Sequence, residues 1–187
     1  MAMYMATAKT GTFYLTETVS IPAGTATSNY VQGSVDLSAY INVPTGQALA
    51  IESVDFIFQA GTDYGAAVSG MMAGNGSLDV QLTDLNPGTA LVRADDLSLV
   101  ASGSLQIDQS NNVGTMVSDL YPDNHGPASL SEAFLVVNDT LYLVAGPNGA
   151  SSGGSINYIT ARIKARVVKL STKDWMAIAI GQVAADN

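Results

Sequence analysis

Short runs of β-branched and aromatic residues, separated by turn residues, follow one another along most of the chain. In residues 12–20 and 77–85, apolar and polar side chains alternate, which is typical of a strand that buries one face. Similar runs occupy residues 29–37, 47–59, 89–93, 97–108, 113–117, 134–137, 140–145 and 155–170. Between them, no segment has a helical period long enough for a crossover between parallel strands. The pattern predicts an all-β protein, an antiparallel β-sandwich or barrel of eight to ten strands.

Turn residues predict how some of these strands are connected. Asn86-Pro87-Gly88 is typical of a tight turn, after which residues 89–93 return as a short strand. Asn138-Asp139 lies between two strand candidates and indicates a β-hairpin. The longest irregular stretches, residues 60–76 and 146–154, are rich in Gly, Ser and Ala. Loops of this type at the ends of a sandwich either contact partners or form mobile tips.

One helix is expected after the last strand. Ser171 or Thr172 can cap it, and Ser171 with Asp174 forms a capping box. Apolar residues at positions i, i+4 and i+7 give one apolar stripe: Met176, Ile180 and Val183, extended by Trp175 and Ile178. We therefore divide the chain into an N-terminal arm (1–11), a single β-sandwich domain (12–170), and a C-terminal helix with its tail (171–187).

One pattern in the chain suggests catalysis. Residues 149–153 match the G-x-S-x-G pattern of serine hydrolases, with Ser151 as the nucleophile. That chemistry requires a strand-to-helix turn, but the pentapeptide lies between two strand candidates. The single histidine, His125, precedes the serine, whereas in these hydrolases it follows. There is no phosphate-binding glycine motif and no cysteine, and no two of the 16 acidic residues stand out as a catalytic pair. We expect no enzymatic activity and no cofactor.

Possible metal ligands are concentrated in residues 119–126, which contain Asp119, Asp123 and His125. The same segment suits a turn, because Pro122 fixes φ and Asp123 can bond its own backbone. We favour the turn and predict no metal site, and the sequence leaves open whether these three residues bind an ion. A second acidic and amide group lacks the spacing of a helix–loop–helix calcium loop: Asp108, Asn111 and Asn112.

Charge is scarce and mostly negative. The 187 residues include 7 Lys and Arg against 16 Asp and Glu, a net charge of −9, and 12% are charged, compared with about 25% in an ordinary domain. The negative excess repels phosphates and argues against nucleic-acid binding by the whole surface. A domain with so few charges tends to precipitate unless other subunits cover it. We recognise no signal peptide, and no run of about 18 apolar residues could span a membrane.

The positive charge lies near the C-terminus. Five of the seven basic residues fall within twelve positions: Arg162, Lys164, Arg166, Lys169 and Lys173. In a strand, Arg162, Lys164 and Arg166 project from one face at a spacing of about 6.6 Å and repel one another unless negative charge faces them. That charge can come from Asp and Glu of the same chain, from an acidic neighbouring subunit, or from nucleic-acid or lipid phosphates. The five residues are therefore candidate assembly contacts.

Eight or more antiparallel strands, long Gly/Ala/Ser loops, an acidic background and no catalytic set together resemble the single jelly-roll capsid proteins of icosahedral viruses. The resemblance is one of pattern and covers residues 12–170. It implies two four-stranded sheets packed face to face, a location in the virion, and copies that tile a shell with one another and with other virion proteins. Many RNA-virus capsid proteins of this shape begin with a basic arm, but residues 1–11 hold only Lys9. The chain is more similar to capsid proteins of DNA viruses in which a membrane or other proteins line the shell.

The sequence thus predicts a structural, self-assembling capsid shell subunit, with nucleic acid or lipid contacted only through the basic segment 162–173. The alternative is a carbohydrate-binding or adhesive β-sandwich, which needs exposed aromatic residues such as Tyr64, Tyr121 and Tyr158. A third hypothesis is a sandwich-fold hydrolase that uses Ser151 and His125. Outside a virion, we expect a soluble protein.

Overall fold

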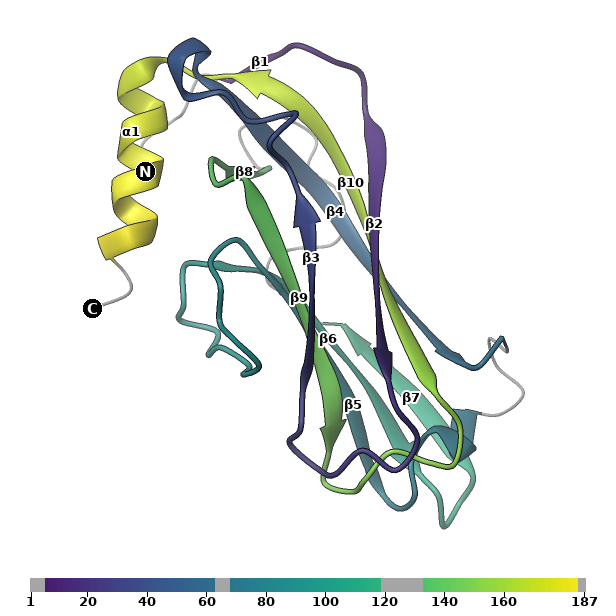
Figure 1. The fold of residues 1–187 in the computed structure, drawn as a ribbon. Coiled ribbons are helices and arrows are strands. Elements are labelled where there is room, and N and C mark those ends of the chain that lie inside the picture. Colours follow the sequence, from purple (N-terminus) through teal and green to yellow (C-terminus); the bar gives the residue numbers. More distant parts are fainter. Residues whose placement is uncertain (1–5, 63–67, 119–132, 185–187) are drawn as a thin grey trace.

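Two five-stranded sheets share one core in the computed structural model, which describes residues 6–62, 68–118 and 133–184 (Figure 1). The elements are β1 (Thr7–Ala8), β2 (Phe13–Ile21), β3 (Val31–Asp36), η1 (Val43–Thr45), β4 (Gln47–Ala60), η2 (Val68–Met71), β5 (Gly76–Thr83), β6 (Leu99–Asp108), β7 (Val113–Ser118), β8 (Phe134–Val136), β9 (Thr140–Asn148), β10 (Asn157–Lys169) and α1 (Thr172–Ala184). The first sheet contains β1, β2, β10, β4 and β8, and the second sheet has the order β3-β9-β5-β6-β7.

All pairs of neighbouring strands are antiparallel, and four of these pairs are nested. β2 pairs with β10, β3 with β9, β4 with β8, and β5 with β6. The first strand of this set therefore meets the last, and the two middle strands meet each other. One long antiparallel hairpin rolled into two sheets produces this order, which is the jelly roll. β1 and β7 extend the two sheets, and the fold class expected from the sequence is confirmed.

An apolar core fills the space between the sheets. Inward-facing side chains alternate along the strands, as in β10, where Ile159 and Ile163 are fully buried. β4 changes its inward parity at a β-bulge, where Glu52 is the additional residue. Ile51 before the bulge and Val54 after it both belong to this core, so the bulge keeps apolar side chains inward on both halves of a long strand.

The turn at Asn138-Asp139 connects the two sheets. β8, before the turn, pairs with β4 in the first sheet, whereas β9, after it, pairs with β3 and β5 in the second. The predicted hairpin is therefore wrong. Asn138 Nδ2 donates to the Asp84 carbonyl at 2.9 Å, and the Leu37 amide donates to the Asp139 carbonyl at 2.7 Å. These two hydrogen bonds to other segments fix the turn at which the chain passes from the first sheet to the second.

Residues 89–93 form no strand and belong to the irregular connection 84–98 between β5 and β6. The side chain of Gln81 in β5 bonds both backbone groups of Val92. The Val92 amide donates to Gln81 Oε1 at 2.7 Å, and Gln81 Nε2 donates to the Val92 carbonyl at 2.9 Å. A side-chain amide replaces a backbone ladder here, so the predicted short strand is wrong.

The helix α1 lies against the outer face of the first sheet. Ser171 caps it as expected, because the Asp174 amide donates to Ser171 Oγ at 3.1 Å and that hydroxyl donates to Asp174 Oδ2 at 2.7 Å. Its buried side carries Trp175, Ile178 and Ala179, which pack in a second apolar cluster with residues of β4, β10 and the segments beside them.

The apolar stripe predicted for α1 is only partly confirmed, because Trp175 and Ile178 pack on the sheet whereas Met176 and Ile180 do not. Met176 is 47% exposed and Ile180 is 62% exposed, so both lie on the outward side of α1. The Val183 side chain lies outside the described part of the chain. The spacing did not discriminate between the two sides because residues 175–184 contain no charge, and an apolar stripe can be drawn on either.

Candidate functional site

The basic residues of β10 line the outer face of the first sheet. Ile163 and Ala165 are fully buried, whereas Arg162 is exposed and Lys164 and Arg166 are partly exposed. The predicted common face of these three cations is confirmed. The remaining two candidates are both exposed: Lys169 at the end of β10 and Lys173 in the first turn of α1.

Glu52 faces two of the three cations. Its Oε2 lies 3.5 Å from Lys164 Nζ, and its Oε1 pairs with Arg166 Nη2. The Glu52 side chain is only 6% exposed, whereas those of Lys164 and Arg166 are 39% and 30% exposed. A nearly buried carboxylate needs such partners, because an unpaired buried charge is costly. The negative charge that faces Lys164 and Arg166 therefore comes from the same chain.

Glu52 does not stand out in the sequence. Regular alternation counted back from the inward row Val54, Phe56 and Phe58 would place it on the inner face of β4. The bulge breaks that alternation, so Glu52 lies on the outer face beside the cations. A signal was present in the sequence, since the apolar alternation of Leu49 and Ile51 resumes at Val54 with a shift of one residue.

Arg162 has a different environment. Its guanidinium carbon lies 4.7 Å from the ring centroid of Tyr14 in β2, a cation–π geometry, and Tyr14 itself is 53% exposed. In the strand register, Arg162 lies between Thr16 of β2 and Asp55 of β4. Both the guanidinium and the ring remain accessible to a partner.

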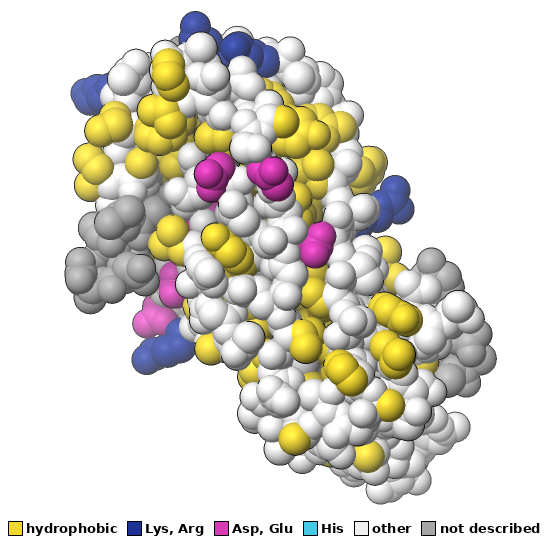
Figure 2. Space-filling model, in the orientation of Figure 1, with side chains coloured by type: hydrophobic (Ala, Val, Ile, Leu, Met, Phe, Trp, Pro, Cys, Tyr) yellow, Lys and Arg dark blue, Asp and Glu magenta, His cyan; other side chains and the backbone are white. Residues whose placement is uncertain are grey.

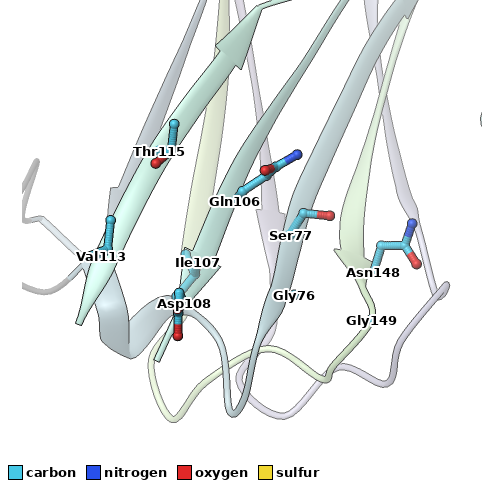
Figure 3. Close-up of a pocket in the computed structure, with 9 residues that line it drawn as sticks. All are labelled: Gly76, Ser77, Gln106, Ile107, Asp108, Val113, Thr115, Asn148 and Gly149. Atoms are coloured by element: carbon cyan, nitrogen blue, oxygen red, sulfur yellow. The ribbon is translucent and has the colours of Figure 1, made fainter. Parts of the chain in front are cut away.

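A shallow groove of about 450 Å³ crosses one end of the second sheet (Figure 3). Its lining comes from β5, β6, β7 and β9 and the turn after β9: Gly76, Ser77, Gln106, Ile107, Asp108, Val113, Thr115, Asn148 and Gly149. Asn148, Ser77, Gln106 and Thr115 form one cross-strand row in the register. Asp79, one position further along this face, orders the row by accepting a 3.0 Å bond from Asn148 Nδ2. The groove offers hydroxyl and amide groups.

The pentapeptide 149–153 holds loops together. It lies between β9 and β10, so the strand-to-helix turn of a hydrolase nucleophile does not occur there. Ser152 is 2% exposed; its Oγ accepts from the Thr25 amide at 2.7 Å and donates to the Pro22 carbonyl at 2.8 Å. The Ser151 carbonyl accepts from the Ala73 amide at 2.9 Å. His125 lies outside the described residues.

Asp119 and Asp123, for which the sequence favours a turn over an ion site, also lie outside the described residues, as do Tyr64 and Tyr121. Within the described ranges, no three His, Cys, Asp or Glu side chains are grouped as metal ligands. Asp108 bonds within its own turn: its Oδ2 accepts from Asn111 Nδ2 at 2.6 Å, and this bond is the main cause of its lowered pKa. Tyr158 lies on β10, away from the groove. Across the described chain, no helix has the length and apolarity needed to cross a membrane.

A buried carboxyl follows β5. Asp84 is 1% exposed, and burial raises its pKa to about 7, with a smaller contribution from the charge of Asp96. Its amide donates to the Ser98 carbonyl at 3.0 Å, which closes the 84–98 connection. This carboxyl makes the stability of the fold depend on pH.

Comparison with known proteins gives no matching protein family and no match to a characterised sequence. Among solved structures, the chain is similar to an unassembled VP1 pentamer subunit of Merkel cell polyomavirus, with 12% identity over 90% of this chain and 100% of that chain and a TM-score of 0.42. It is also similar to turnip yellow mosaic virus (10% identity, 87% and 96% covered, TM-score 0.32) and maize chlorotic mottle virus (11%, 86% and 96%, 0.29). At these identities the likeness concerns the fold alone.

Proposed function

We propose that this chain is a structural, self-assembling protein, the shell subunit of a virus capsid, and that it acts through contacts between its copies. Jelly rolls also occur in lectins and cupins, so the fold by itself does not decide the function. The observation that carries the proposal is the apolar surface of a charge-poor chain. Large apolar side chains are 44–62% exposed on β2, η1, β7, α1 and the loops: Tyr14, Val43, Leu97, Val113, Met116, Ile156, Met176 and Ile180.

Such a surface suits a subunit whose neighbours cover it. Only 12% of the residues are charged, and obligate interfaces are apolar like a domain core cut in half. A shell provides every copy with several neighbours at once, which explains why the apolar side chains are spread over several elements.

The basic segment divides into two roles in this proposal. Lys164 and Arg166 hold Glu52, so they serve mainly within the chain. Arg162, Lys169 and Lys173 are exposed and remain for contacts with acidic surfaces of neighbouring copies. Any contact with nucleic acid, lipid or other virion proteins is expected through the same segment.

The test is the mass of the purified full chain as a function of concentration and salt, measured by light scattering after size exclusion and by sedimentation velocity. Electron microscopy of the same samples then identifies shells or their fragments. We expect concentration-dependent assemblies that high salt alters. A monodisperse monomer across all concentrations and salt conditions would refute self-assembly.

A carbohydrate-binding module is the second candidate, and the groove of the second sheet is the observation that favours it. Neutral hydroxyl and amide side chains such as Ser77, Gln106 and Asn148 suit hydrogen bonds to sugar hydroxyls. Glycan-array binding by a monomer, abolished in Gln106→Ala and retained in the control Thr16→Ala on the other sheet, would support this function over assembly. If the wild type and the Thr16→Ala control both bind no glycan, the carbohydrate-binding function is rejected.

A further inference from the structure

Residues 175–181 of α1 are all apolar, so apolar side chains lie on both sides of this part of the helix. Trp175, Ile178 and Ala179 pack on the first sheet. The opposite side carries residues at positions i, i+3, i+4 and i+7, all exposed: Lys173, Met176, Ala177 and Ile180. We call these four residues the outer α1 face. A helix with apolar side chains on both sides normally buries both of them, so a partner is needed to cover this face.

Basic residues flank this apolar surface. Lys173 lies in the first turn of α1, where a positive charge opposes the helix dipole, so it does not serve the stability of the helix. Lys169 pairs in register with Thr7 of β1, and the Lys9 amide donates to the Val167 carbonyl at 2.8 Å, so these two lysines share one end of the sheet. Among the described residues, none of the three lysines is in an ion pair. Figure 2 shows hydrophobic side chains over α1 and basic side chains at the same end of the molecule.

A partner for this surface must combine apolar contact with negative charge. The β5–β6 connection of this chain does so at Asp95, Asp96 and Leu97, the one place in the sequence with two consecutive acidic residues. Leu97 is 58% exposed, and the Asp95 side chain is 71% exposed. We call residues 95–97 the acidic loop. Asp95 pairs with Arg93 at 3.3 Å, but an ion pair this exposed is weak and can exchange its partner.

We propose that the outer α1 face docks on the acidic loop of a second copy, with Ile180 and Met176 against Leu97 and Lys173 toward Asp95. The proposal rests on the self-assembly proposed above and names its contact. α1 and the β5–β6 connection project from the same side of the molecule (Figure 1). Two copies related by a two-fold axis on that side make the contact twice.

Crosslinking of cysteine variants tests the contact, because the chain contains no cysteine of its own. Ile180→Cys and Leu97→Cys are made as separate proteins with tags of different mass, mixed in equal amounts at an assembling concentration, and oxidised. The mixed disulfide between the two variants is expected to exceed both homodimers. The control pairs Ile180→Cys with Val43→Cys at η1, a position 54% exposed compared with 58% for Leu97, and is expected to give no such excess.

Three results would overturn the contact while leaving the proposed function intact. Dominant Ile180→Cys homodimers would mean that helix packs on helix. Assembly without any of these disulfides would place α1 elsewhere. Co-flotation of the wild-type chain with anionic phosphatidylserine vesicles, lost in Ile180→Asp, would make a lipid surface the occupant. A monomeric wild type in the mass measurement would instead refute the proposed function itself.

Charge exchange gives a second readout. Lys173→Glu is expected to weaken assembly by about two- to fivefold, the range of an exposed ion pair. Asp95→Lys is expected to do the same, and the double variant Lys173→Glu/Asp95→Lys to recover most of the loss. Absence of recovery in the double variant, with both single variants folded by circular dichroism, would contradict the pairing.

Discussion

Asp84 carries a carboxyl that is almost completely buried, and its pKa is raised to about 7 from an ordinary value of 3.8, mainly because burial disfavours the charged form. Between pH 4 and pH 7 the unfolded carboxyl is ionised while the folded one keeps its proton. The folded state then binds more protons, so the free energy of unfolding falls as the pH rises, by about 1.4 kcal/mol per pH unit. The stabilisation is complete below the unfolded pKa and is lost as the pH rises through the folded pKa.

The substitution Asp84→Asn removes this titration. Over the interval from pH 5 to pH 8, the raised pKa corresponds to a loss of about 2–3 kcal/mol in the wild type, which the variant does not suffer. The free energy of unfolding of Asp84→Asn, taken relative to that of the wild type, is therefore expected to be about 2–3 kcal/mol higher at pH 8 than at pH 5. For a chain of this size, this difference corresponds to about 5–10 °C in Tm. Urea unfolding followed by circular dichroism at pH 5, 6, 7 and 8 measures this difference. All samples are kept at one protein concentration, because the proposed self-assembly would also stabilise the fold.

The control is Asp36→Asn on the surface at the end of β3. The pKa of Asp36 is lowered, first by the hydrogen bond from the Ser38 amide, so its stabilising effect is present above the unfolded pKa and is lost as the pH falls below it. This control is expected to leave the slope between pH 5 and pH 8 unchanged. Parallel stability curves for wild type and Asp84→Asn over that interval would refute the assignment of a neutral buried carboxyl to Asp84.

Three further predictions concern the sheets and their loops. Glu52→Gln leaves two partly exposed cations without their carboxylate and is expected to lower the free energy of unfolding by about 1–3 kcal/mol in urea titrations; an unchanged midpoint would show that the ion pairs contribute nothing. Gly153→Ala places a Cβ against the backbone of η2 and is expected to reduce Tm strongly, whereas Gly154→Ala meets open space and should fold like wild type; equal Tm values would contradict the close packing. Ile163 is fully buried in the core, so Ile163→Ala is expected to lower the free energy of unfolding by about 2–5 kcal/mol, measured by calorimetry or urea unfolding. A decrease no larger than that of the surface control Thr160→Ala would contradict the place of Ile163 in the core.

The strands were predictable where a local pattern specified them. Leu78 and Leu82 of β5 alternate with polar residues and are fully buried, as period-two geometry requires. The connections were less predictable. Asn138-Asp139 has the composition of a hairpin turn, yet the strands on its two sides pair with other strands far away in the sequence. Residues 89–93 resemble a strand, but the Gln81 side chain occupies the backbone groups of Val92.

The candidate site was likewise predictable only where a pattern within one strand specified it. The common face of Arg162, Lys164 and Arg166 follows from alternation within one strand, and the structure agrees. Their partner did not follow, because Glu52 reaches the same face through a bulge whose position depends on pairing between β4 and β10. The buried side of α1 was predicted only in part for a related reason. Trp175 and Ile178 pack on the sheet whereas Met176 and Ile180 do not, and residues 175–184 carry no charge that marks one side.

The sequence by itself determined the all-β class, the approximate strands, the Ser171 cap and the clustering of positive charge. These properties depend on neighbouring residues and on backbone geometry that repeats every two or every 3.6 residues. The tertiary structure alone decided the nested pairing of the jelly roll, the carboxylate that faces the basic strand, and which apolar side chains of α1 stay exposed. Each of these depends on distances between segments that are far apart in the chain, and a local pattern does not contain those distances.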